Sequence, residues 1–221
     1  MMQTETILFD LDGEWMGQFL PLLRRGFTWP YQPGQSLRSV LIEAGIPQEY
    51  IEERLQTIFL NGSPADSLDM PVYGAQVRLA LSTAMPGILG ATMRRGGYYA
   101  SMRDSISSRA MTREEAASSG SQAEAQGWLT IRLLNFTASE AGPFFLRRGV
   151  GLETEDVMDI VTGLPEAFWH SCRQVQAAGT SLEPSREPVI RWLQNKGQVW
   201  LRIIDQSGKP GQESSQGKDQ A

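Results

Sequence analysis

Apolar positions along the chain follow two spacings. Alternation of apolar and polar residues predicts half-buried strands, and this pattern covers residues 6–11, 55–60, 74–81, 130–136 and 197–203. Recurrence of apolar residues at every third or fourth position predicts amphipathic helices, and this pattern covers residues 36–44 and 154–161. Both kinds of element are therefore expected, in an α+β fold.

Local features predict the ends of the first helix and the position of one turn. Ser36 can cap the helix, because its hydroxyl can accept hydrogen bonds from the first free N–H groups. Gly45 is a suitable residue for the C-terminal end. The pair Asn61-Gly62 follows an apolar run and predicts a tight turn between two strands.

The two halves of the chain repeat the same landmarks. The string "FLPLLRRGF" in the first half corresponds to "GPFFLRRGV" in the second, and each precedes a predicted helix. Gly26 matches Gly149 and Val77 matches Val199, at offsets near 123 residues. Such a repeat predicts a duplicated domain. The alternative is two unrelated α+β domains.

Composition divides the chain into four parts. Residues 105–126 are poor in large apolar side chains, which predicts a linker with a short helix at 112–117. Residues 205–221 have no large apolar side chain, which predicts a disordered tail. Two folded units remain, at 1–104 and 127–204.

Charge and residue counts exclude several classes of protein. The net charge of −5 argues against nonspecific nucleic-acid binding, which requires a basic face. The single cysteine and single histidine exclude an intrachain disulfide and a Cys/His zinc site. No apolar run approaches the roughly 18 residues that predict a membrane span, and the N-terminus lacks the pattern of a signal peptide. We therefore expect a cytoplasmic protein without membrane or nucleic-acid partners.

The stretch "PGQSLRSVLIEAGIP … TIFLNGSPADSLDMPVYGAQVRLALS" resembles the β-grasp, ubiquitin-like sulfur-carrier proteins of thiamin and molybdopterin synthesis. Asn61-Gly62 matches the family's turn, residues 69–74 match its polar loop, and residues 77–81 match its last strand. The resemblance covers about residues 6–87, and the internal repeat extends it to the second half. It implies two tandem β-grasp domains.

The family's chemistry lies in a C-terminal Gly-Gly, whose carboxylate is adenylated and converted to a thiocarboxylate. This chain instead continues through Met85-Pro86-Gly87 and Arg95-Gly96-Gly97. A working carrier would therefore need cleavage after Gly87 or Gly97. Otherwise these glycines provide turns and close backbone approach in an extension packed on the first unit.

The string "MRRGGYYASMR" is the predicted partner-binding segment, because Arg and Tyr are enriched at interaction hot spots. Its predicted contact residues are Arg94, Arg95, Tyr98, Tyr99 and Met102. Arg-Arg-Gly also occurs at 24–26 and 147–149. Such guanidinium groups can bind anions, or they can bond to nearby carboxylates at the ends of elements.

Two patterns suggest catalysis but lack the residues that it requires. Asp10 and Asp12 in "FDLDGEW" look like the nucleophile strand of the haloacid-dehalogenase phosphatases, yet no Gly-Asp metal motif follows. Asp12-Gly13 is better interpreted as a turn. His170 and Cys172 are two positions apart, which directs them to different faces of a helix and opposes a Cys–His pair.

These observations predict no catalytic residue, no metal site and no cofactor, so we expect a protein that is not an enzyme. The leading hypothesis is a non-catalytic protein-interaction module that resembles the sulfur carriers. Its first domain would dock an unidentified enzyme or assembly partner through its sheet face and residues 85–103. Two alternatives remain open. One is a carrier released by proteolysis at Gly87 or Gly97, and the other is a small anion-binding protein that uses Arg94 and Arg95.

Overall fold

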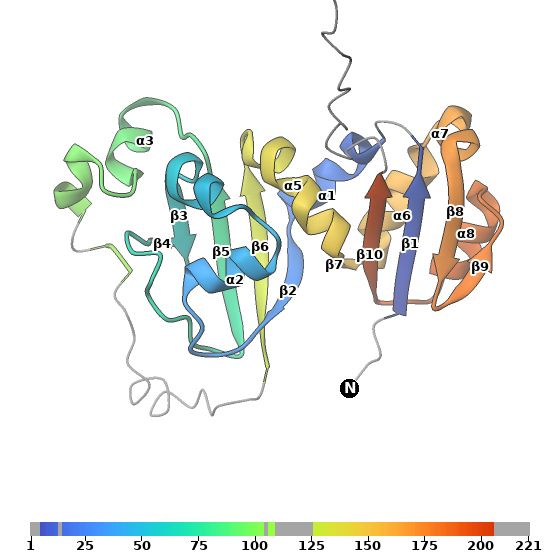
Figure 1. Cartoon of the computed structure of the whole chain (residues 1–221), viewed down its shortest axis with the longest axis horizontal. Helices are drawn as coiled ribbons and strands as arrows, with labels where there is room; N and C mark the ends of the chain where they lie inside the picture. Colours follow the sequence, from blue (N-terminus) through green and yellow to red (C-terminus); the bar gives the residue numbers. More distant parts are fainter. Residues whose placement is uncertain (1–4, 13–14, 104–105, 109–125, 206–221) are drawn as a thin grey trace, which may run out of the picture.

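The computed structural model describes residues 5–12, 15–103, 106–108 and 126–205. Most of the predicted linker, including the short helix at 112–117, and the predicted tail after Asp205 lie outside the described residues. The described strands form one ten-stranded sheet. Figure 1 shows this sheet and the helices around it.

The strands are β1 (Glu5–Leu11), β2 (Phe27–Tyr31), β3 (Thr57–Leu60), β4 (Ser63–Pro64), β5 (Gln76–Ser82), β6 (Gly127–Leu134), β7 (Val150–Glu153), β8 (Cys172–Ala177), β9 (Thr180–Leu182) and β10 (Gln198–Asp205). The helices are α1 (Leu20–Arg25), α2 (Leu37–Glu43), α3 (Gly87–Met93), α5 (Thr137–Arg148), α6 (Thr154–Gly163), α7 (Glu166–Ser171) and α8 (Arg186–Leu193). Short helical turns are η1 (Met16–Phe19), η2 (Tyr50–Arg54) and η3 (Tyr98–Arg103).

The two halves of the chain exchange their first strands. The sheet order is β4-β3-β5-β6-β2-β7-β10-β1-β8-β9. β1 pairs in parallel with β10 and antiparallel with β8, so it lies among strands of the second half. β6 pairs in parallel with β5 and antiparallel with β2, so it lies among strands of the first half. Figure 1 shows β6 next to β5 and β1 next to β10.

A mixed fold of strands and helices agrees with the α+β prediction. The finer prediction, two tandem β-grasp domains, is not confirmed, because each half supplies its first strand to the other end of a shared sheet. Alternation of apolar residues identifies a strand, but it does not identify the strand's neighbours.

Helices α1 and α5 make the crossings that this exchange requires. Each follows the exchanged strand of its half, and the two helices pack on each other. Between them and the sheet, the rings of Phe27 and Phe145 pack edge to face with centroids 4.9 Å apart. The sequence patterns predicted no helix within residues 19–27 or 142–150. The structure shows that helix α1 and most of helix α5 occupy these stretches.

The repeat of landmarks corresponds to a repeat of local structure. Gly26 and Gly149 have φ angles of 129° and 101°, and each separates a helix that ends in Arg-Arg from a strand. The expected turn at Asn61-Gly62 has φ angles of 51° and 87°. In the second half Ala178-Gly179 has φ angles of 49° and 81° between β8 and β9. Both turns have the positive φ pair of a two-residue hairpin connection.

The first predicted helix is confirmed with its cap. Ser36 Oγ accepts a hydrogen bond from the backbone N–H of Ser39 at 3.1 Å. Gly45 follows the end of α2 with a φ of 87°, as expected for a C-terminal glycine. The residues of α2 that are buried are Leu37, Val40 and Leu41.

Candidate functional site: an apolar extension after β5

The segment 85–108, which follows β5 and is called the extension here, exposes an unusual amount of apolar surface. Nine large apolar side chains are exposed in the described part of the chain, and six of them lie in the extension. They are Ile88, Leu89, Tyr98, Tyr99, Met102 and Ile106. The exposed fraction reaches 90% for Tyr98 and 83% for Ile88. Clustered exposed apolar residues are typical of interaction surfaces.

Arg103 holds the extension in its folded shape. Its guanidinium donates to the Asp66 carboxylate at 2.6 and 2.9 Å, and Nε donates to the carbonyl of Thr92 at 2.6 Å. Further bonds reach Ser107 Oγ and the carbonyl of Arg94. Only 3% of the Arg103 side chain is exposed. A buried guanidinium requires such a set of acceptors, so its position fixes both α3 and η3.

Arg94 and Arg95 attach the extension to the first half of the chain. Nε and Nη2 of Arg94 donate to Oε1 of Gln56 at 3.0 and 2.5 Å. Nη2 of Arg95 donates to the carbonyls of Ile51 and Glu52 at 3.1 and 3.0 Å. Burial lowers the pKa of Arg95 from its ordinary value. Both guanidinium groups, which the sequence analysis assigned to partner contact, therefore also bind this protein's own carbonyl and amide oxygens.

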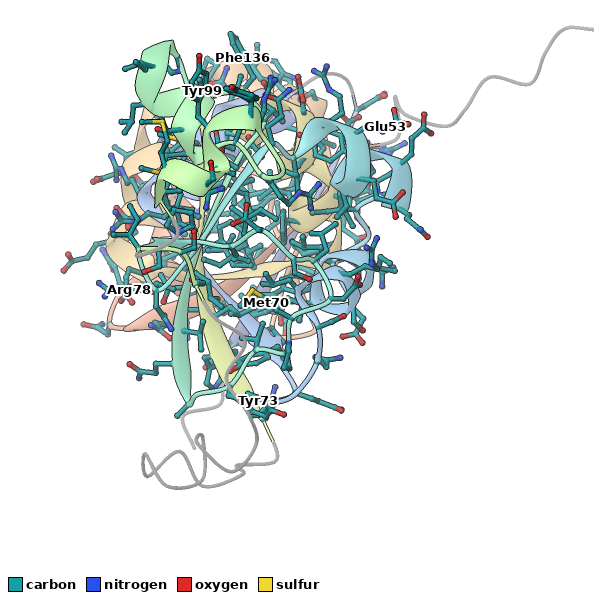
Figure 2. All side chains as sticks on the ribbon, turned by 90° about the vertical axis from the view of Figure 1, so that its left-hand side faces the viewer. Glu53, Met70, Tyr73, Arg78, Tyr99 and Phe136 are labelled. Carbon is teal, nitrogen blue, oxygen red and sulfur yellow. The ribbon has the colours of Figure 1, made fainter. Side chains whose placement is uncertain are left out.

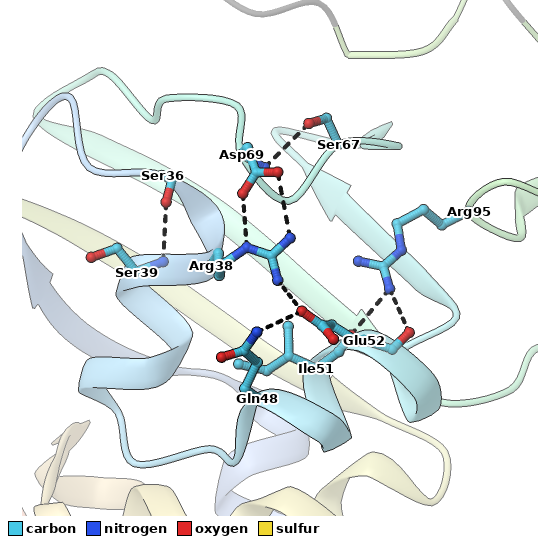
Figure 3. A network of polar contacts seen from close by, with 9 residues as sticks. All are labelled: Ser36, Arg38, Ser39, Gln48, Ile51, Glu52, Ser67, Asp69 and Arg95. Carbon is cyan, nitrogen blue, oxygen red and sulfur yellow. Dashed lines mark hydrogen bonds and ion pairs between the residues drawn. The ribbon is translucent and has the colours of Figure 1, made fainter.

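Arg95 adjoins a network of charged side chains, which Figure 3 shows. Arg38 donates to Asp69 at 2.7 Å and to Glu52 at 2.5 Å. The hydrogen bond with Asp69 raises the pKa of Arg38, and the same bond lowers the pKa of Asp69. The pKa of Glu52 is lowered, first by the hydrogen bond from Gln48 and then by that from Arg38.

A hollow of about 460 Å³ lies beside this network, lined by Arg38, Asp66, Ser67, Leu68, Asp69 and Arg95. Its two acidic side chains are each bound by an arginine, Asp66 by Arg103 and Asp69 by Arg38. The carboxylates therefore offset the positive charge of the hollow. An added anion would meet two acidic groups as well as two guanidinium groups, so the geometry gives the anion-binding alternative little support.

A second hollow, of about 590 Å³, lies at the start of the extension. It is lined by Arg24, Ala84, Met85, Pro86, Asn135 and Phe136. Phe136 is 69% exposed, and Figure 2 shows it at the same end of the molecule as Tyr99. Arg24 has no hydrogen bond or ion pair among the residues that the structure describes. The hollow thus combines apolar walls with one available guanidinium.

The two glycines of the carrier alternative lie in folded backbone. Gly87 has a φ of 70° and begins α3. The close packing of α3 on Met85 requires Gly90, because a Cβ there would lie 1.7 Å from the carbonyl oxygen of Met85. Gly97 donates its N–H to the carbonyl of Arg94 at 3.2 Å. Neither position lies in an extended tail of the kind that enters a partner enzyme.

In "DLDG" the Asp10 carboxylate and the Asp12 backbone bond to other parts of the chain. Asp10 accepts a hydrogen bond from Arg173 at 2.8 Å. The backbone N–H of Asp12 donates to the carbonyl of Ser171 at 2.9 Å. These bonds fix the end of β1 beside β8. The expected turn at Asp12-Gly13 lies partly outside the described residues, since Gly13 is not among them.

His170 and Cys172 lie in different environments, and the Cys172 thiol is not activated. His170 is exposed at the end of α7, whereas Cys172 is buried at the start of β8. Burial raises the pKa of the Cys172 thiol to about 12, with a smaller contribution from Asp10. A nucleophilic cysteine requires the opposite shift.

Sequence reasoning placed Arg103, Ile88 and Leu89 within the predicted docking segment 85–103, but it assigned no individual role to any of them. Asp66 lies 37 residues before Arg103, so no local pattern could connect them. Ile88 and Leu89, in contrast, stand in the string "PGILGA", where two large apolar residues between glycines could have indicated an exposed apolar turn.

Comparison with known proteins assigns this chain to no family. Within the described ranges, no helix is long and apolar enough to cross a membrane. The same ranges contain no group of three or more His, Cys, Asp or Glu side chains placed to hold a metal ion. No family model, curated protein or solved structure matches the chain.

Proposed function

We propose that the protein is a non-catalytic interaction module that docks an enzyme or assembly partner through the extension. The observation that carries this proposal is the group of six exposed apolar side chains on a segment held by the buried guanidinium of Arg103. A surface that is already ordered loses less conformational entropy on binding, and this increases affinity.

The arrangement supports a partner with an apolar centre and an acidic edge. Tyr98, Ile88 and Met102 are the most exposed apolar side chains of the extension and serve as the anchors. The hollow beside Phe136 accepts an apolar side chain of the partner. Arg24 at the rim of that hollow pairs with a carboxylate of the partner.

The test is quantitative co-purification of the tagged chain from its native cell. We compare the wild type with the double variant Ile88→Ser/Met102→Ser and with the control Ile42→Ser, which changes an apolar side chain of similar type on α2. The partner should be retained by the wild type and the control and reduced about tenfold or more in the double variant. Equal recovery with all three chains would rule out the extension as the docking surface.

The carrier alternative has a separate measurement. The intact mass of the protein from its native cell distinguishes a full-length chain from one that ends at Gly87 or Gly97. A chain ending there, above all with one oxygen replaced by sulfur, would establish a carrier and overturn the proposal of a non-catalytic module.

A further inference from the structure

A groove of about 480 Å³ crosses the middle of the sheet, where the two halves of the chain meet. Its central lining residues are Thr28, Gln76, Trp128, Thr130, Gly151, Gln198 and Trp200. They come from five adjacent strands, β5, β6, β2, β7 and β10. The groove contains the start of β5 at Gln76, whereas the extension follows the opposite end of that strand. The groove is thus distinct from the proposed docking surface.

Strand register places the groove's side chains on one face. Trp128 is opposite Gln76, and Thr28 is opposite Thr130. Thr28 is also opposite Gly151, which in turn is opposite Trp200. Residues directly opposite one another in a sheet share a face. The two indoles therefore flank a floor of threonine hydroxyl groups and glycine backbone.

Gly151 on β7 and Gly149 directly before this strand leave space for the side chains that line the groove. A Cβ on Gly151 would lie 2.1 Å from Thr28 Oγ1 and 3.3 Å from the ring of Trp200. A Cβ on Gly149 would lie 2.2 Å from Nε1 of Trp200. The Trp200 ring therefore lies directly against the backbone of this strand. Only glycine at both positions permits that placement.

The charged groups in the lining already have partners within the protein. Arg25 binds Asp156 at 2.5 Å, and Glu153 accepts a hydrogen bond from the Gln198 amide at 2.6 Å. No other charged side chain lines the groove among the described residues. Arg25 and Asp156 offset each other, and Glu153 is held by a neutral amide, so the lining contains no unpaired cation that would favour an anion. We therefore consider the groove best matched to a neutral ligand.

The remaining chemistry identifies a class of ligand. Trp128 is 42% exposed and presents an indole, whose faces attract positively polarised C–H groups. The Gln and Thr side chains can both donate and accept hydrogen bonds, as ligand hydroxyl groups require. We infer that the groove binds a neutral mono- or disaccharide, with C–H faces against the indoles and hydroxyls toward the amides and hydroxyls of the protein. The volume lies within the usual range of about 300–1,000 Å³ for such sites.

The test is isothermal titration calorimetry of the full chain with glucose, N-acetylglucosamine, maltose and cellobiose. Saturable binding of at least one of these sugars is expected. Trp128→Ala should weaken that binding about tenfold, through loss of the ring contact. Thr28→Val, which removes a hydroxyl but retains the shape of the side chain, should also weaken it. Phe136→Ala, an exposed aromatic outside the groove, is the matched control and should leave it unchanged.

Two results would overturn the inference. The first is no saturable heat at about 20 mM of any of the four sugars, a concentration that would nearly fill a site with a Kd of roughly 1 mM. The second is binding of glucuronic acid or inorganic phosphate without binding of the neutral sugars. Arg132, whose side chain passes within 3.4 Å of the Cβ position of Gly26, would then be the responsible cation. Arg132→Gln would identify that case.

Discussion

Arg103 and Asp66 form a two-point ion pair, with N–O distances of 2.6 and 2.9 Å, across 37 residues of sequence. The guanidinium is 3% exposed, whereas the carboxylate side chain is 43% exposed. The arginine has therefore lost its water, and Asp66 supplies the compensating charge. This pair is the main polar connection between the apolar extension and the loop after β4.

Removing the carboxylate should release the extension. We expect Asp66→Ala to lower the free energy of unfolding by about 2 kcal/mol. This is less than the roughly 3–5 kcal/mol found for fully buried pairs, because Asp66 reaches solvent. Hydrogen exchange measured by mass spectrometry should show faster exchange across 87–103 before the rest of the chain is affected.

The matched control is Asp69→Ala, which removes another carboxylate bound to an arginine. Arg38 keeps Glu52 as a partner after this change, and the pair is solvent-exposed. A much smaller loss of stability than for Asp66→Ala is therefore expected. If the two variants exchange equally fast across the extension, Asp66 has no special role in holding it.

The exposed apolar side chains of the extension should contribute little to folding. Tyr98→Ser and Met102→Ser should each change the free energy of unfolding by less than about 0.5 kcal/mol, because both side chains face water. The same changes should reduce binding of a hydrophobic dye such as anilinonaphthalene sulfonate. A large loss of stability in urea unfolding would show that these residues pack in the core, contrary to the structure.

The elements that sequence predicted best depend on local signals. Helix α2 has its apolar stripe, its Ser36 cap and its terminal Gly45 within one short stretch. Helix α5 was missed because Gly142 and Pro143 disfavour a helix. The reason for Gly142 is tertiary: a Cβ there would lie 2.8 Å from side-chain atoms of Leu20 and Leu23 on α1. Close approach of two helices thus overrides local propensity.

The sequence also could not show which strands pair. β1 and β6 were both identified, yet their exchange between the halves depends on long-range pairs such as Glu5 with Val199 and Gln76 with Trp128. The candidate site, too, could be predicted from the sequence only in part. Tyr98 and Met102 could be proposed from residue type, whereas the role of Arg103 depends on a partner that only the fold brings near.

Replacing Gly151 of β7, where the two halves of the chain meet, with a larger residue should destabilise the protein. Gly151→Ala would force its Cβ against Thr28 Oγ1 at 2.1 Å, so we expect a loss of about 1–3 kcal/mol in the free energy of unfolding. Thr28→Ala in the same chain should recover part of this loss, because it removes the obstructing hydroxyl. Chemical denaturation of the two single variants and the double variant measures this coupling.

Gly163→Ala provides the control for that experiment. It lies at the end of α6, its backbone φ is not positive, and no heavy atom lies within 4 Å of its Cβ position. We expect it to leave stability unchanged or to raise it slightly. Additive effects of Gly151→Ala and Thr28→Ala would contradict the contact between these two residues.

The Cys172 thiol should resist alkylation in the folded protein. Its raised pKa of about 12 leaves little thiolate at pH 8, and its side chain is buried. Iodoacetamide should therefore react with the native chain far more slowly than with the urea-unfolded chain, where the thiol has its ordinary pKa. Equal rates for the native and unfolded chains would show that Cys172 is accessible and ionised.

Alkaline pH should destabilise the fold through Cys172 and Tyr31. Burial raises the pKa of each group to about 12, from ordinary values of 9.0 and 10.0. Above its ordinary pKa, each group loses its proton in the unfolded chain while the folded chain retains it. The stabilising contribution is therefore complete below about pH 9 and is lost as pH rises toward 12. Urea unfolding at pH 7, 9 and 10.5 should show a falling midpoint.

The variant Tyr31→Phe tests the contribution of Tyr31. It loses the hydrogen bond to the carbonyl of Gly74, so its unfolding midpoint at pH 7 should be lower than that of the wild type. The midpoint should then decline less steeply with pH, because one titrating group is gone. A midpoint that declines as steeply in Tyr31→Phe as in the wild type would show that Tyr31 does not contribute to the pH dependence.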